Sequence, residues 1–307
     1  MRRSLLVIAT LALLAGGAIE AVGQGGPTPT GDPTAEADPA SLAAPTGRDA
    51  AMPAWSAIRP HSKAARDVWF DAIATLRTGE VVVVGRGRGR ASPVRAFVFD
   101  RSDPRSWQTV SLPSRKRAVA VDIVAWDDEF IAVGTRLPKF GPPQVLIWRS
   151  PDGRSWRRPS RIDDAEARDL LATDDGLALL GVTWDGARRP VPTLWRSTDG
   201  RAFEATPVAD AGHRARRVAR SPSGTWIVVG QRTNEDGYAA EHVLWRSVDG
   251  GDRETIDLPF ADASRLMEVV AADWTPSGFI IVVDLDLAGP EDPFGEIWHS
   301  PEGIVWT

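Results

Sequence analysis

A nine-residue segment that begins with tryptophan recurs along the chain and constrains its fold more than any other feature. It spans residues 148–156 and reads Trp-Arg-Ser-Pro-Asp-Gly-Arg-Ser-Trp. The core of this segment recurs in three further segments, which begin at Trp195, Trp245 and Trp298. The leading tryptophans are 47, 50 and 53 residues apart. A repeat of this period indicates one supersecondary unit that cannot bury its own apolar face and must stack on its neighbours. We therefore expect a repeat protein.

The residues between the copies predict four β-strands in each unit. An apolar run of four or five residues, preceded by a turn rich in Gly, Asp, Pro and Ser, fits a strand that is buried on both faces. These runs span residues 81–85, 130–134, 177–181, 226–230 and 279–283. In the second unit another apolar run (118–124) precedes the turn, and a third strand (145–148) leads into the repeated segment. A short fourth strand is expected after it. Four antiparallel strands about every 50 residues predict an all-β fold, the β-propeller. No segment keeps a 3.6-residue apolar period, which excludes a helical solenoid.

The phase of the repeat predicts the number of blades. The tryptophan that closes the repeated segment stands at Trp156 and Trp306 and also at Trp107; one further period back lies Trp55. The 251 residues from Trp55 to Trp306 correspond to five blades. We expect a strand near residues 54–60 to complete the last blade, because pairing it would remove an exposed strand edge. The alternative is an incomplete ring of six or seven blades.

The N-terminus predicts export. Arg2 and Arg3 precede an apolar run that starts at Leu5, and small residues follow up to about Gly23, which is typical of a secretory signal peptide. Residues 1–23 are thus predicted to be a signal peptide, or alternatively an uncleaved membrane anchor. Residues 24–53 hold mainly Gly, Pro, Ala, Thr and Asp and predict a disordered linker. The propeller is assigned to residues 54–307, and the location is predicted to be extracytoplasmic.

Composition narrows the functional classes. The formal charge of −5 argues against a nucleic-acid binder, whose domain is usually basic. The absence of cysteine excludes disulfides and thiolate metal sites. The four histidines show no ligand spacing, so we expect no metal site and no cofactor. The expected partner is a glycan or a protein, with contact to a membrane only through an uncleaved N-terminus, and the chain is expected to be a monomer.

The pattern Ser-x-Asp-Gly-x-x-Trp resembles the Asp-box, or BNR repeat, of the sialidase-like β-propeller superfamily. A short Asp side chain can accept hydrogen bonds from its own turn, and Gly can adopt positive φ without steric cost. The resemblance places this turn on the rim away from the substrate face and implies a structural role. The residues concerned are Ser150, Asp152, Gly153, Trp156, Ser197, Asp199, Gly200, Ser247, Asp249, Gly250, Ser300, Glu302, Gly303 and Trp306.

Sialidase activity is the function that this resemblance invites. Its chemistry uses a Tyr nucleophile paired with a carboxylate, and arginines that clamp the carboxylate of the substrate. The single tyrosine, Tyr238, lies in a loop with Glu235 and Asp236, but the Arg-Ile-Pro motif of the family is missing. We therefore expect no catalytic residue and a non-catalytic binding or scaffold module; the alternative is an exo-glycosidase of sialidase type. The ligand face is predicted to include Arg86, Arg88, Arg90, Arg136, Lys139, Trp184, Arg189 and Tyr238.

Overall fold

The computed structural model describes residues 68–87, 93–100, 103–114, 117–234, 239–259, 267–285 and 294–307. The predicted signal peptide, the linker, and the closing strand near residues 54–60 lie outside these ranges. Within them every regular element is a strand, and no helix long and apolar enough to cross a membrane was found.

The strands form five antiparallel sheets in which each strand pairs with the next one along the chain. Blade 1 holds β1 (Val68–Thr75), β2 (Glu80–Gly87), β3 (Val94–Asp100) and β4 (Asp103–Ser111). Blade 2 holds β5 (Ala118–Trp126), β6 (Glu129–Arg136), β7 (Gln144–Ser150) and β8 (Ser160–Asp163). Blade 3 holds β9 (Glu166–Thr173), β10 (Gly176–Trp184), β11 (Pro190–Ser197) and β12 (Glu204–Pro207). Blade 4 holds β13 (His213–Arg220), β14 (Thr225–Thr233), β15 (Ala239–Val248) and β16 (Arg253–Ile256). Blade 5 holds β17 (Met267–Thr275), β18 (Gly278–Leu285) and β19 (Phe294–Ser300) among the described residues.

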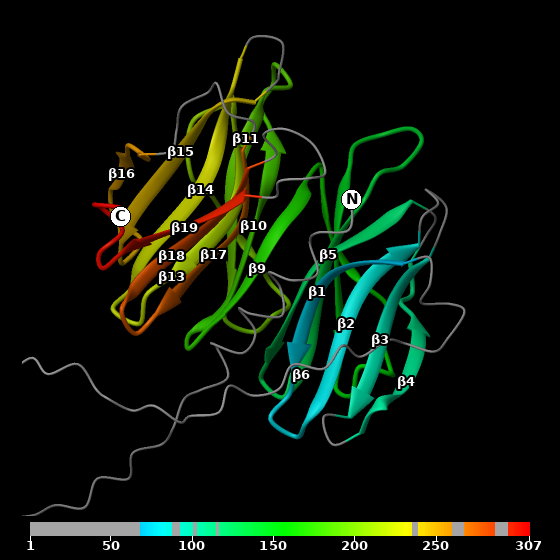
Figure 1. Cartoon of the computed structure of the whole chain (residues 1–307). Coiled ribbons are helices and arrows are strands. Elements are labelled where there is room, and N and C mark those ends of the chain that lie inside the picture. Colours follow the sequence, from blue (N-terminus) through cyan, green and yellow to red (C-terminus); the bar gives the residue numbers. More distant parts are fainter. Residues whose placement is uncertain are drawn as a thin grey trace, which may run out of the picture.

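This arrangement is a five-bladed β-propeller, as the spacing of the repeat predicted. The first strand of each blade is the innermost, and β1, β5, β9, β13 and β17 contact one another in that order. In Figure 1 the outer strands β4 and β16 lie at opposite edges of the molecule, with β1, β5 and β9 between them. All five predicted apolar runs fall within the second strands β2, β6, β10, β14 and β18.

The core lies between the blades, which explains why the second strands are apolar on both faces. In β10, Leu177 and Leu179 belong to a cluster shared with blade 2, whereas Ala178 and Leu180 belong to a cluster shared with blade 4. Alternate side chains of a strand point to opposite faces of its sheet, so a strand between two neighbours must be apolar at every position. The uninterrupted apolar runs are therefore a direct consequence of stacking.

The repeated tryptophan packs onto a glycine of the neighbouring strand. A Cβ atom added to Gly134, Gly181 or Gly230 would lie 2.1–2.4 Å from a carbonyl oxygen of the innermost strand and within 3.0 Å of the ring of Trp148, Trp195 or Trp245. These second-strand glycines are thus required by close approach of backbone and ring. In blade 2 the buried Trp148 also donates a hydrogen bond from Nε1 to the carbonyl of Pro113, at 2.8 Å.

Candidate functional site

The Ser-x-Asp-Gly turns are held by side chains of their own residues. Asp152 Oδ1 accepts hydrogen bonds from the N–H groups of Arg154 (2.8 Å) and Ser155 (2.7 Å) and from the hydroxyl of Ser150 (3.0 Å). Burial raises the pKa of Asp152, but these hydrogen bonds outweigh it and lower the pKa below its usual range. Trp156 Nε1 donates to the carbonyl of Gly153 at 2.7 Å.

The other copies repeat this geometry only in part. Asp199 accepts from the N–H groups of Arg201 and Ala202, and the hydroxyl of Ser197 donates to it at 3.1 Å. Where Glu302 replaces Asp, the hydroxyl of Ser300 accepts the turn N–H groups of Gly303 and Ile304 instead.

The third copy departs furthest from the pattern. There Ser247 Oγ donates to the carbonyl of Gly251 at 3.0 Å, and Asp249 adopts a φ of 51°.

The arginine that follows the repeated tryptophan contacts the turn of the next blade. Arg149 donates from Nη1 to the carbonyl of Asp199 at 3.1 Å, and Arg246 donates from Nε to the carbonyl of Glu302 at 2.8 Å. Arg196 lies beside Gly250 in the same way. The repeated segment therefore joins successive blades.

The predicted ligand-face residues are dispersed. Arg86 lies 3.7 Å from Asp71, while Arg136 donates to Gln144 at 2.6 Å. The other three described residues form no such link to another strand. Lys139 is exposed and lies over the ring of Phe140. Trp184 is half-buried at the end of β10, and Arg189 pairs with Asp185 in its own loop. Arg88, Arg90 and Tyr238 lie outside the described residues. Among those described, Trp184 and Arg189 share the hairpin between β10 and β11, whereas Arg86, Arg136 and Lys139 lie on blades 1 and 2.

A different set of polar residues gathers on the innermost strands, where each strand carries a β-bulge. The pairing register shifts by one residue at Asp71, Val121, Arg168, Arg216 and Val270. A bulge re-aims the side chains around it. The position directly after the bulge holds Asp122 in blade 2, Asp169 in blade 3 and Arg217 in blade 4.

These three residues link each blade to the next. Asp122 Oδ2 accepts from the N–H of Leu170 and Asp169 Oδ2 accepts from the N–H of Val218, both at 2.8 Å. Arg217 Nε donates to the carbonyl of Val270 at 2.8 Å. Burial, and after it the charge of the nearby Asp169, raises the pKa of Asp122 to about 8; burial also raises the pKa of Asp169. The two carboxyls interact with each other, so the pair holds a proton near neutral pH.

Next to this pair lies a cluster of half-buried arginines, which we call the arginine cluster: Arg168, Arg214 and Arg216. Burial lowers the pKa of Arg168 and of Arg216. The carboxylates of Glu166 and Glu268 raise these two pKa values in turn, and the charges of Arg214 and Arg217 lower both. Arg168 pairs with Glu166, and Arg216 donates from Nε and Nη2 to Gln231, at 3.1 and 2.9 Å. The buried Nε of Arg214 has no hydrogen-bond partner among the described residues. Guanidiniums that crowd one another and retain unused donors are suited to bind an anion.

Asp71 is a second unusual group on the innermost strands. Its Oδ1 lies 3.7 Å from Arg86 Nε, and its buried Oδ2 has no hydrogen-bond partner within the described part of the chain. Burial raises the pKa of Asp71 to about 7, although Arg86 lowers it. A carboxyl with such a pKa can exchange a proton near neutral pH.

Sequence reasoning missed these residues because it assigned the ligand face to loops. The signal that could have found them is the run His-Arg-Ala-Arg-Arg (213–217), which places three arginines on β13, the innermost strand of blade 4. Charged residues on a strand between two blades are costly unless they are paired or functional. Within the described ranges, no group of three or more His, Asp or Glu side chains is arranged to hold a metal ion.

Comparison with known proteins agrees with the fold. No family model and no curated protein matches the sequence. Among solved structures, the chain is similar to an α-L-arabinanase from Penicillium chrysogenum, with a TM-score of 0.50, 11% identity, and coverage of 76% of this chain and 81% of that one. For a xyloglucanase from Xanthomonas campestris the TM-score is 0.51 and the identity 16%, and the match covers 78% of this chain and 38% of that one. For a sialidase from Trypanosoma rangeli the TM-score is 0.52 and the identity 11%, and the match covers 77% of this chain and 46% of that one. At these identities the likeness establishes a propeller fold shared with glycoside hydrolases, sialidase among them, and no activity.

Proposed function

We propose that this chain is an exported, non-catalytic binding module that holds an anionic glycan at the arginine cluster. The observation that carries the proposal is the crowding of Arg168, Arg214 and Arg216 on the innermost strands of blades 3 and 4. Keeping like charges close together costs free energy, and a bound carboxylate or sulfate would offset that cost. The fold neighbours, whose names describe enzymes of glycan breakdown, favour a glycan over other anions.

The remaining parts of the proposal follow from the sequence. The charged and apolar N-terminus supports export, and the linker would hold the propeller away from the cell surface. The Ser-x-Asp-Gly turns are proposed to be Asp-boxes with a structural role, because their side chains are engaged in the turn and in contacts between blades. In this proposal they do not bind ligand.

A glycan array with sialylated, uronate-containing, sulfated and neutral glycans tests the proposal. We expect binding to acidic glycans that weakens with salt, since the contact is mainly charge to charge. The double variant Arg214→Gln/Arg216→Gln should lose this binding, whereas Arg157→Gln, an exposed arginine of blade 2, should keep it. Retention of acidic-glycan binding by the double variant would contradict the proposal.

A second candidate function, glycoside hydrolysis, is favoured by Asp71. Its raised pKa and its unpartnered Oδ2 are properties of a general acid that protonates a leaving-group oxygen. Fluorogenic sialosides and arabinofuranosides test this candidate. Turnover by the unchanged chain that is abolished in Asp71→Asn would establish hydrolysis and overturn the non-catalytic assignment.

A further inference from the structure

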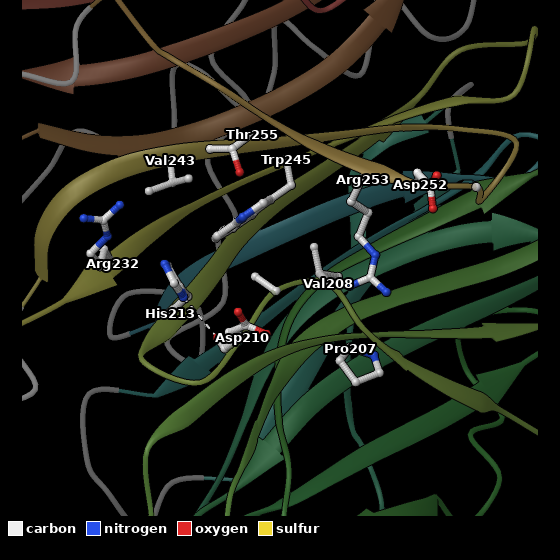
Figure 2. Close-up of a pocket in the computed structure, with 12 residues that line it drawn as sticks. Pro207, Val208, Asp210, His213, Arg232, Val243, Trp245, Asp252, Arg253 and Thr255 are labelled. Carbon is white, nitrogen blue, oxygen red and sulfur yellow. Dashed lines mark hydrogen bonds between the residues drawn. The ribbon is translucent and has the colours of Figure 1, made fainter.

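A groove lies between blades 3 and 4, and Trp245 and Gly251 of the third repeated segment line part of it. Its volume is about 720 Å³, which lies within the range of small-molecule sites. Figure 2 shows that blade 3 contributes the segment of Pro207, Val208 and Asp210, and that blade 4 contributes residues from all four of its strands. No sequence motif pointed to this groove.

The histidine of the groove has a fixed orientation. His213 Nδ1 lies 3.0 Å from the carbonyl oxygen of Asp210, so Nδ1 carries the hydrogen and donates it. The ring of His213 meets the ring of Trp245 edge to face, with centroids 5.5 Å apart and an angle of 85°. In Figure 2 the other ring nitrogen, Nε2, points away from Asp210 toward the side of the groove where Arg232 and Val243 lie. Nε2 is thus the ring nitrogen that can meet a ligand there.

The charges of the groove balance. Arg232, which is also ion-paired with Glu241 at 3.2 Å, and Arg253 supply guanidinium donors, while Asp210 and Asp252 supply carboxylate acceptors. Arg253 forms no ion pair or side-chain hydrogen bond with any described residue, and Figure 2 shows its side chain reaching toward Val208 across the groove. Two cations and two anions give no preference for a charged ligand. They can, however, bind hydroxyl groups, each of which both donates and accepts.

The floor of the groove adds an apolar surface. Val208 and Val243 line it together with an edge of Trp245, and the hydroxyl of Thr255 lies beside them. An apolar floor with a few convergent donors and acceptors is the usual composition of a site for a small ligand. The C–H faces of a sugar ring fit such a floor, and its hydroxyls fit the polar rim.

We propose that this groove is a second binding site, and that it takes a neutral oligosaccharide. The groove and the arginine cluster share strand β13, where His213 precedes Arg214, but none of the three arginines of the cluster lines the groove. The two sites are expected to differ in their response to salt, because a neutral ligand releases no counterions and feels little screening.

A calorimetric titration tests the proposal. The full chain is titrated with arabinotriose, cellotriose and xylotriose. At least one of these sugars should bind, with an affinity that changes less than about twofold between 0.05 and 0.5 M sodium chloride. Arg253→Ala and Asp252→Ala should each weaken binding about tenfold or more, which corresponds to about 1.4 kcal/mol. Thr255→Trp, which fills the groove from β16, should abolish it. Arg161→Ala, an exposed arginine on the outer strand β8 of blade 2, is the matched control and should bind as the unchanged chain does.

The other outcomes would overturn the proposal. These are the absence of binding by all three sugars at about 10 mM, and binding that persists in Thr255→Trp while circular dichroism shows an intact fold. Arg214→Gln/Arg216→Gln separates the two sites. It should lose acidic glycans and keep the neutral sugar, so that each site can fail without the other.

Discussion

The carboxylate of Asp122 lies across the boundary between two blades and accepts a hydrogen bond from the backbone N–H of Leu170 at 2.8 Å. Its other oxygen accepts from the N–H of Ile123 at 2.7 Å. The same position in blades 3 and 4 makes the corresponding link onward, through Asp169 and Arg217. A side chain on the innermost strand of blades 2, 3 and 4 therefore fastens its blade to the next one.

Removing the carboxylate of Asp122 should destabilise the propeller. Asp122→Ala leaves two backbone N–H groups without an acceptor, and leaving a buried donor unpaired costs about 1–3 kcal/mol. We expect a loss of about 2–4 kcal/mol in the free energy of unfolding, measured by urea denaturation. The matched control is Asp174→Ala in the exposed turn before β10, which should change stability by less than about 0.5 kcal/mol. Equal effects of the two substitutions would contradict the structural role of Asp122.

The proton on the pair Asp122–Asp169 should make stability depend on pH. The folded-state pKa of Asp122 is raised to about 8, from 3.8 in a model peptide. The folded chain therefore binds more protons than the unfolded chain between about pH 4 and pH 8, and the free energy of unfolding falls as the pH rises through this window. One proton contributes a slope of at most about 1.4 kcal/mol per pH unit.

Asp122→Asn isolates this contribution, since an amide does not titrate. Denaturation curves at several pH values should show a smaller slope for this variant than for the unchanged chain. Asp152→Asn is the control, because the pKa of Asp152 is lowered and its titration lies below the window. A slope that Asp122→Asn leaves unchanged would show that the pair does not hold the proton.

The repeated turns should differ in their sensitivity to loss of the aspartate. Asp152 accepts three hydrogen bonds through Oδ1, so Asp152→Ala should cost about 1–2 kcal/mol. Asp249 accepts no such bonds from described residues in its own turn, where Ser247 and Gly251 are hydrogen-bonded instead. Asp249→Ala should therefore change stability by less than about 0.5 kcal/mol. Thermal denaturation of both variants decides this, and a larger loss in Asp249→Ala would be the contrary result.

Two glycines with positive φ should tolerate alanine very differently. Gly153 (φ 70°) is buried, and an added Cβ would lie 2.4 Å from Val82 of blade 1; Gly141 (φ 94°) has open space around it. Both substitutions strain the backbone, by about 1–2 kcal/mol, but only Gly153→Ala also overpacks the core, at a further cost of about 1–3 kcal/mol. Urea denaturation should rank Gly153→Ala as clearly less stable than Gly141→Ala. The reverse order would contradict the packing of this turn against blade 1.

The contrast between fold and site explains what the sequence could predict. Three of the four repeated tryptophans pack on a second-strand glycine, so their spacing reports blade geometry directly, and both the strands and the count of five could be predicted. For the arginine cluster, the run 213–217 marks the arginines of β13, but their approach to Arg168 could not be predicted, because Arg168 and Arg216 come together through bulges on the innermost strands β9 and β13. The groove between blades 3 and 4 has the same origin: Asp210 and Arg253 are 43 residues apart and meet only when the blades stack.

The most direct test of the central claim is calorimetric titration of the full chain with a trigalacturonate and with a sialylated trisaccharide. We predict saturable binding of at least one of them that weakens severalfold from 0.05 to 0.5 M sodium chloride. We also predict its loss in Arg214→Gln/Arg216→Gln and no hydrolysis during the titration. Undiminished binding by the double variant, or release of sugar that Asp71→Asn abolishes, would contradict the assignment of a non-catalytic module that binds anionic glycans at its innermost strands.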